Sequence, residues 1–199
     1  YVPAAEAAAL KPTVLRAEII YAAMAQRAGY RISRPLRLLF NDHVDDHNGF
    51  FTVVPFPLVE IDLAPARPLS GIFDGANHVE RTLIHEFAHH LSNDRNSGFR
   101  GVLDSIFGRV LPNEPLSLLV FYLSTPAHQT MPALWQEGLA QWAETTYADG
   151  DGPWGGRGRD SLSHMVWRLD AAAGAIPAVD DWRLSAIHWP FGTRAYVYG

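Results

Sequence analysis

Apolar side chains recur every three or four residues along several stretches of the chain, which is the spacing of one face of a helix. This pattern predicts a helix over residues 4–28, which ends before Gly29, and a second helix over 77–92. In the second helix Asn77 and Glu80 have the spacing of a capping box, and the apolar residues form one continuous face. The same periodicity predicts further helices over 99–110, 114–123, 132–147 and 161–173.

Strand patterns are confined to the first third of the chain. Residues 36–40 predict a short strand, and turn-forming residues follow over 42–49. The stretch 50–63 is rich in Phe, Val and Ile, but Pro55 and Pro57 interrupt it, so it predicts an edge strand or a pair of short strands. The predicted fold class is α+β, mainly helical, with a small mixed sheet near the N-terminus.

Composition narrows the classes of function. The 199 residues suit a single domain, with 1–75 forming the N-terminal helix and sheet and 76–199 the helical remainder. A formal net charge of −5 argues against nucleic acid as a partner. No apolar run is close to the length of about 18 residues that is needed to span a bilayer. The chain has no Cys, so a metal would need His and carboxylate ligands. Because it begins at Tyr1 without Met and ends in an apolar run, we expect it to be part of a longer polypeptide.

The strongest chemical signal is the segment His85-Glu86-Phe87-Ala88-His89. Four helical residues advance about 400°, so His85 and His89 lie on the same face, one turn apart, and can both reach one ion. Glu86 lies about 100° around the helix, close enough to hold a water molecule bound to that ion. Two neutral imidazoles leave a zinc ion its positive charge, while the carboxylate can take a proton from the water. The segment therefore predicts a zinc site that activates water.

A catalytic zinc needs a third protein ligand, and the residues directly after this segment do not continue into a longer motif that supplies one. Glu137 is the best candidate, because the small residues Gly138 and Ala140 beside it would let its helix lie close to the His helix. Gln141 and Glu144 share the helix face of Glu137. Such a polar stripe is also typical of a plain solvated helix face.

Two motifs, HEFAHH at 85–90 and LWQEGLAQWAE at 134–144, together resemble the gluzincin branch of zinc peptidases. The Gly-Arg pattern at 155–159 and the Tyr-Val-Tyr-Gly ending at 196–199 are similar to bacterial gluzincin-like domains that precede a β-propeller of WD40-like or TolB-like repeats. The resemblance implies a zincin-like fold, Zn2+ held by His85, His89 and Glu137, and a peptide or protein substrate. It also implies a propeller domain after residue 199 and an extracytoplasmic location, either periplasmic or secreted.

The chain departs from the thermolysin-like pattern at one position behind the metal. Those enzymes have an Asp four residues after the Glu ligand that orients a zinc-bound His, whereas this chain has Gln141 there. A Gln oxygen can accept an imidazole N–H but supplies no charge. Glu144, Asp94 and Asp104 are alternatives for this role, and the sequence does not choose among them.

The resemblance also implies a side chain downstream of Glu137 that stabilises the oxyanion of the tetrahedral intermediate. Tyr196 and Tyr198 are the candidates by position, and His164 and His188 are further candidates. For each Tyr, an aromatic core residue is an equally good interpretation.

The function that these residues predict is a zinc-dependent peptidase, in which Glu86 is the general base for a metal-activated water. By the same resemblance, an edge strand within 50–63 would pair with the substrate backbone. One alternative is a gluzincin-like interaction domain without turnover, attached to a propeller. Another is a structural zinc site, which would need a fourth protein ligand such as His128 or His164.

Overall fold

The computed structural model describes residues 1–32, 34–45, 47–64, 78–95, 97–111, 113–125, 131–148, 158, 161–176 and 178. Within these ranges the chain forms six helices and one three-stranded sheet, so the predicted α+β, mainly helical class is confirmed. The elements in chain order are α1 (Ala7–Arg27), β1 (Arg37–Asn41), β2 (Gly49–Thr52), β3 (Leu58–Asp62), α2 (His78–Asn93), α3 (Gly98–Phe107), α4 (Pro115–Ser124), α5 (Ala133–Tyr147) and α6 (Ser161–Ala173). None of the described helices combines the length and apolar character needed to cross a membrane.

The sheet is mixed, with the strand order β1-β3-β2. β3 pairs in parallel with β1 and antiparallel with β2, so that Val59 lies opposite Leu38 on one side and Phe51 on the other. The stretch 50–63 is therefore a pair of short strands, one of the two predicted arrangements. β2 is an edge of the sheet and β3 its centre, while Pro55 and Pro57 lie in the connection between them, where no ladder hydrogen bond is lost.

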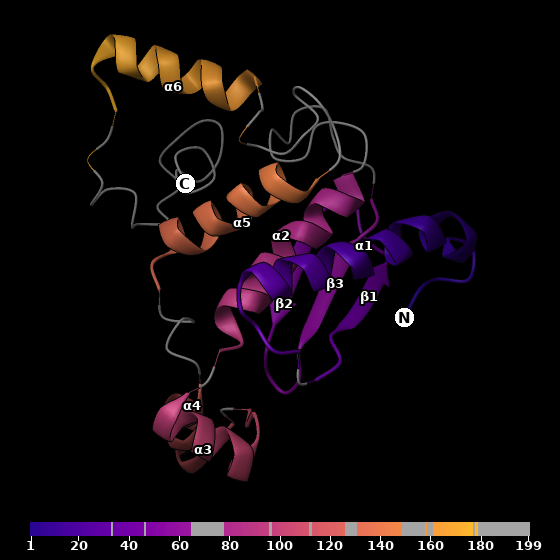
Figure 1. Cartoon of the computed structure of the whole chain (residues 1–199), viewed down its shortest axis with the longest axis vertical. Coiled ribbons are helices and arrows are strands. Elements are labelled where there is room, and N and C mark those ends of the chain that lie inside the picture. Colours follow the sequence, from indigo (N-terminus) through magenta and orange to yellow (C-terminus); the bar gives the residue numbers. More distant parts are fainter. Residues whose placement is uncertain are drawn as a thin grey trace.

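Helix α2 is the element around which the others are arranged. It packs against α1, against β2 and β3, and against α5, and Figure 1 shows it between α5 and the sheet. Its apolar face joins one core with side chains of α1 and the sheet: Leu83, Ile84, Phe87, Tyr21, Met24, Phe40, Val59 and Ile61. Twelve of the 16 residues of α2 are buried, including charged ones. Because the helix is covered on more than its apolar face, its polar side chains have to be satisfied inside the protein.

A buried polar network anchors the end of α2. Asp94, directly after the helix, accepts a hydrogen bond from the Tyr30 hydroxyl at 2.7 Å and pairs with Arg109. Arg109 also donates to Asp104 of α3 at 2.8 Å. Burial alone would raise the pKa of Asp94, but hydrogen bonds from His90 and Tyr30 and the charge of Arg109 lower that pKa to about 2. The ionised Asp94 therefore joins the segments that follow α1, α2 and α3.

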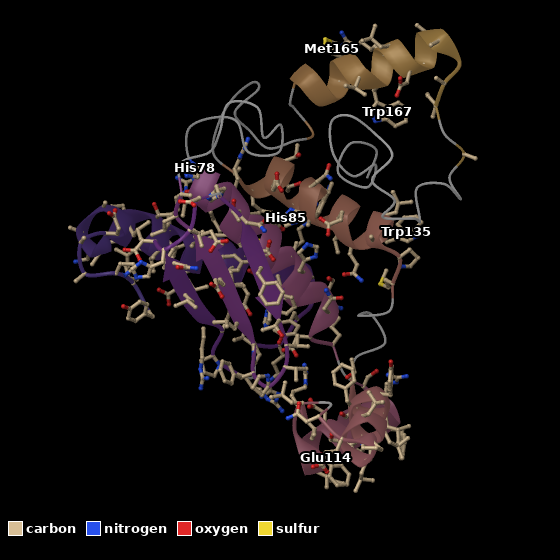
Figure 2. The ribbon with its side chains drawn as sticks, turned by 180° about the vertical axis from the view of Figure 1, so that it is seen from behind. His78, His85, Glu114, Trp135, Met165 and Trp167 are labelled. Atoms are coloured by element: carbon tan, nitrogen blue, oxygen red, sulfur yellow. The ribbon has the colours of Figure 1, made fainter. Side chains whose placement is uncertain are left out.

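Helices α3 and α4 pack against each other and lie beyond the end of α2, away from the sheet (Figure 1). Seen from the opposite side, His85 lies between α2 and α5, and Glu114 marks the distant α3–α4 pair (Figure 2). The sheet, α2 and α5 are thus the elements that can position a site around His85.

We expect the core beneath α2 to set the stability of the domain. Ile61 of β3 is fully buried, whereas Ile19 of α1 is 72% exposed. Ile61→Ala should lower the free energy of unfolding by about 2–5 kcal/mol, because a buried cavity replaces the side chain. The matched control Ile19→Ala should change it by less than about 0.5 kcal/mol. Denaturant unfolding followed by circular dichroism measures both values, and equal effects would show that β3 is not part of the core.

Candidate metal centre

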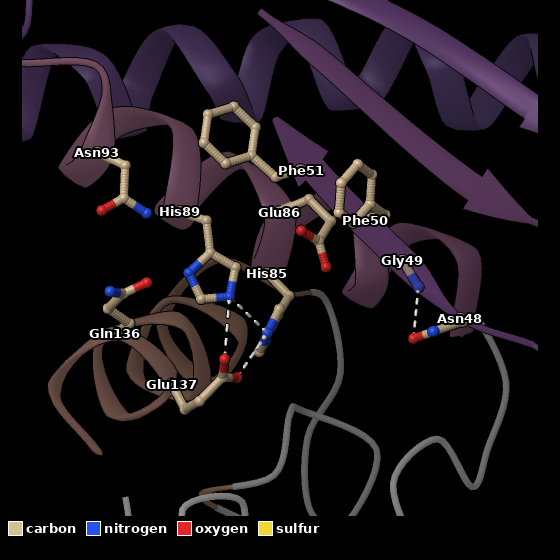
Figure 3. A pocket seen from close by; sticks show the side chains of 10 residues that line it. All are labelled: Asn48, Gly49, Phe50, Phe51, His85, Glu86, His89, Asn93, Gln136 and Glu137. Atoms are coloured by element: carbon tan, nitrogen blue, oxygen red, sulfur yellow. Dashed lines mark hydrogen bonds and ion pairs between the residues drawn. The ribbon is translucent and has the colours of Figure 1, made fainter. Parts of the chain in front are cut away.

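The two histidines of the segment 85–89 face each other on α2. Their Nε2 atoms are 3.0 Å apart, and the rings are nearly perpendicular with centroids 4.6 Å apart (Figure 3). This is the one-turn spacing that the sequence predicts. Side-chain exposure is 5% for His85 and 12% for His89, so both rings are largely removed from water.

Glu137 approaches the two imidazoles from α5. Its Oε2 lies 3.1 Å from His85 Nε2, and its Oε1 lies 3.6 Å from His89 Nε2. The approach is close because small side chains line the contact between the helices: Ala140 is 0% exposed and Ala143 is 1% exposed. The structure thus brings together the three residues that the sequence predicts as ligands.

These three residues form a group that could hold a metal ion, and the fit can be tested on their atoms. A neutral His85 that donates from Nδ1 to Glu144 Oε1, 2.7 Å away, has its lone pair on Nε2. In that form the lone pair and the Glu137 carboxylate are two acceptors 3.1 Å apart, an arrangement that a metal ion between them would stabilise. Bonds of about 2.0–2.2 Å to a tetrahedral ion separate neighbouring ligand atoms by about 3.3–3.6 Å. The observed separations of 3.0 to 3.6 Å are close to that range.

Among the alternatives that the sequence leaves open for orienting a His ligand, Glu144 is the one that contacts His85 Nδ1. It is fully buried on α5, two turns after Glu137, and its carboxylate holds the Nδ1 proton of the imidazole. A carboxylate in this position fixes the tautomer and makes the opposite nitrogen a better ligand. Asp94 and Asp104 belong instead to the network around Arg109 at the far end of α2.

Glu86 lies in the same pocket as the three residues but outside the group that could bind an ion. It is 5% exposed, and Figure 3 shows its carboxylate on the side of the pocket next to β2. There β2 approaches the helix at Gly49, where a Cβ atom would lie 2.7 Å from Glu86 Oε1 and 2.5 Å from Thr82 Cγ2. Only a residue without a side chain fits there, so Gly49 lets the strand touch the helix beside Glu86.

The pocket has a volume of about 260 Å³, and the edge strand β2 contributes to its lining. Asn48, Gly49, Phe50 and Phe51 form its wall on the strand side. The Asp62 amide donates to the Asn48 carbonyl at 2.9 Å, and hydrogen-bonded pairs alternate along an antiparallel ladder. Gly49 and Phe51 therefore direct backbone groups away from β3, toward the free edge.

Comparison of the chain with protein-family models, with curated proteins and with solved structures found no match. The chemistry of the site therefore has to be argued from its own residues.

Several predicted site residues are not part of this centre. Tyr196, Tyr198, His188 and His128 lie outside the described residues. His164 lies on α6, where its Nε2 is 2.9 Å from the Gly158 carbonyl oxygen, and it is not a member of the candidate ligand group.

Four residues that line the pocket were not predicted from the sequence: Asn48, Gly49, Asn93 and Gln136. For Asn93 a signal was present, because it follows His89 by four residues and so lies on the same helix face. Gln136 directly precedes Glu137 on α5. Gly49 gave no signal, since the contact it permits is between distant parts of the chain.

The hydrogen bond from His85 to Glu144 predicts a change in metal affinity. Glu144→Gln keeps the size of the side chain but removes its charge, so the dissociation constant for Zn2+ should rise about 10- to 100-fold. Competition with a chromophoric chelator measures this constant. Glu18→Gln on the exposed side of α1 is the matched control and should leave it unchanged. An unchanged constant in Glu144→Gln would mean that His85 needs no orientation by this carboxylate.

The contact at Gly49 predicts overpacking. Gly49→Ala should lower the free energy of unfolding by about 1–3 kcal/mol, because the added methyl group overlaps Thr82 and Glu86. Thr82→Ser removes the nearer of these atoms and keeps the hydroxyl that bonds His47. The double variant Gly49→Ala/Thr82→Ser should recover part of the loss in denaturant unfolding. Simple addition of the two single effects would contradict a direct contact.

Proposed function

We propose that this chain is a zinc-dependent peptidase of the gluzincin type. Two imidazoles and one carboxylate are a ligand set that catalytic zinc uses, and it leaves a position for water or substrate. The observation that carries the proposal is Glu86, a buried carboxylate that shares the pocket with His85, His89 and Glu137 without being one of the ligands. The resemblance of HEFAHH and LWQEGLAQWAE to gluzincin motifs supports the same reaction class.

In this mechanism each protein group has one task. When bound, zinc supplies a Lewis acid that polarises the substrate carbonyl and lowers the pKa of water. Glu86 accepts the proton of the attacking water and later delivers it to the amine nitrogen that leaves as the peptide bond breaks. Glu144 holds His85 in place throughout, because it occupies the nitrogen that faces away from the pocket.

A peptide substrate also suits the wall of the pocket. β2 is an edge strand, and an extended peptide can pair with its free backbone groups whatever side chains the peptide carries. The outward groups belong to Gly49 and Phe51, beside Glu86 and the candidate ligands. The Gly49 N–H donates to Asn48 Oδ1 at 2.9 Å, so pairing would use the Gly49 carbonyl and the Phe51 groups. A peptide held there would place a backbone carbonyl next to the site.

A purely structural zinc site would need a fourth protein ligand. Among the described residues the candidate group contains three, and His164 is held at the Gly158 carbonyl. His128, the other candidate for a fourth ligand, lies outside the described residues.

The role of Glu86 gives the deciding experiment. Glu86→Gln should lower kcat/KM for a zinc-loaded peptidase assay by about 10²- to 10⁴-fold, because the general base is lost. Its zinc content should stay at one ion per chain, because Glu86 is not among the candidate ligands. Elemental analysis and cleavage of a fluorogenic peptide library measure the two quantities, with Glu18→Gln as the control for an exposed Glu.

Full metal-dependent activity in Glu86→Gln would contradict this mechanism. A wild-type chain that binds zinc but cleaves no peptide would instead support the alternative of an interaction domain without turnover.

A further inference from the structure

Asn93 is a buried polar side chain that the proposed mechanism does not use. It is the last residue of α2, one turn beyond His89, and it is 6% exposed. Its Oδ1 atom is buried and accepts no hydrogen bond from any residue that the structure describes. Buried amide oxygens are nearly always bonded in folded proteins, so an unbonded oxygen in a side chain that lines two cavities indicates that the Asn93 amide turns to a partner when these cavities are occupied.

Gln136 completes the opposite side of this position. It lies in the first turn of α5, and its Nε2 donates to the Met131 carbonyl at 2.8 Å. That bond fixes the orientation of the amide. Figure 3 shows the amide ends of Asn93 and Gln136 pointing toward one another, next to His89.

The two amides stand where the metal pocket continues into a second cavity. The pocket at the metal centre and a neighbouring cavity of about 310 Å³ share Phe51, Asn93 and Gln136. The second cavity follows β2 away from the metal centre, and its remaining lining is Thr52, Val53, Val54 and Phe121. None of these side chains is charged. The groove therefore has a neutral polar entrance and an apolar, aromatic continuation.

We propose that Asn93 and Gln136 form a subsite for a neutral carboxamide side chain, Gln or Asn, of a substrate residue close to the bond that is cleaved. This inference rests on the proposed peptidase function. In either orientation Asn93 presents one NH2 group and one oxygen, which a carboxamide can match with its own oxygen and NH2 group.

Other substrate side chains fit this lining less well. An apolar side chain would give the Asn93 amide no hydrogen-bond partner. A Lys, Arg or Glu side chain would lose its water beside a lining that offers no opposite charge. The neutral amide pair thus selects for hydrogen bonding without charge.

The test compares matched peptides that differ only by Gln, Leu, Glu or Lys at each position flanking the cleaved bond. With the full zinc-loaded chain, kcat/KM should be about three- to tenfold higher for Gln than for Leu at one position. Asn93→Leu should reduce this Gln-to-Leu ratio to about one, whereas the exposed control Asn113→Leu should preserve it. Asn93→Asp is nearly isosteric and should turn the preference toward Lys. A variant that merely misfolds would lose activity on all the peptides and gain no new preference.

Binding separates this inference from the peptidase proposal. Dissociation constants of the Gln and Leu peptides are measured by calorimetry on Glu86→Gln, which should bind without cleaving. Cleavage of the library with no preference for Gln would overturn the subsite and leave the peptidase in place. Tighter binding of the Gln peptide without any cleavage by the wild type would support the subsite and overturn the peptidase. Equal binding without cleavage would overturn both.

Discussion

Helix α2 is covered on nearly every side, and this burial forces its polar side chains to find partners inside the protein. Neighbouring polar residues of α2 find their partners on different sides of the helix. His89 faces His85 and Glu137, whereas His90, the next residue, lies 3.0 Å from the Tyr21 hydroxyl on the side of α1. One helix therefore supplies both ligands of the candidate metal centre and a structural polar contact, because a step of one residue turns the side chain by about 100°.

The position of the site follows from two close approaches to this helix. α5 comes near through Ala140 and Ala143, which bring Glu137 and Glu144 to the same imidazole from two turns of one helix. β2 comes near through Gly49, which places a sheet edge beside Glu86. Large side chains at these places would move both walls outward, and neither the ligand group nor the strand wall would form. The pocket is thus a consequence of small residues as much as of reactive ones.

The sequence predicted the parts of this arrangement that depend on local geometry. Helical periodicity placed His85, Glu86 and His89 relative to one another, and the coordination needs of zinc then pointed to Glu137. The sequence could not single out Glu144, because Gln141 shares the same helix face with Glu137, and only the folded chain shows that Glu144 reaches His85 Nδ1. The pairing of β3 between β1 and β2 joins segments that are apart in the chain, so a five-residue apolar pattern could not reveal which strand is central.

The carboxylate that contacts His85 lies at another position than the thermolysin-like pattern would predict. In the thermolysin-like pattern an Asp four residues after the Glu ligand orients a His, and this chain has Gln141 at that position. Glu144 lies seven residues after Glu137, a rotation of about −20°, so it stays on the same helix face as Glu137. It lies about one turn beyond Gln141. A Glu side chain is one methylene longer than Asp, and from there it reaches His85 Nδ1 at 2.7 Å. The imidazole needs only a buried negative acceptor at the right distance, and either helical turn can provide it.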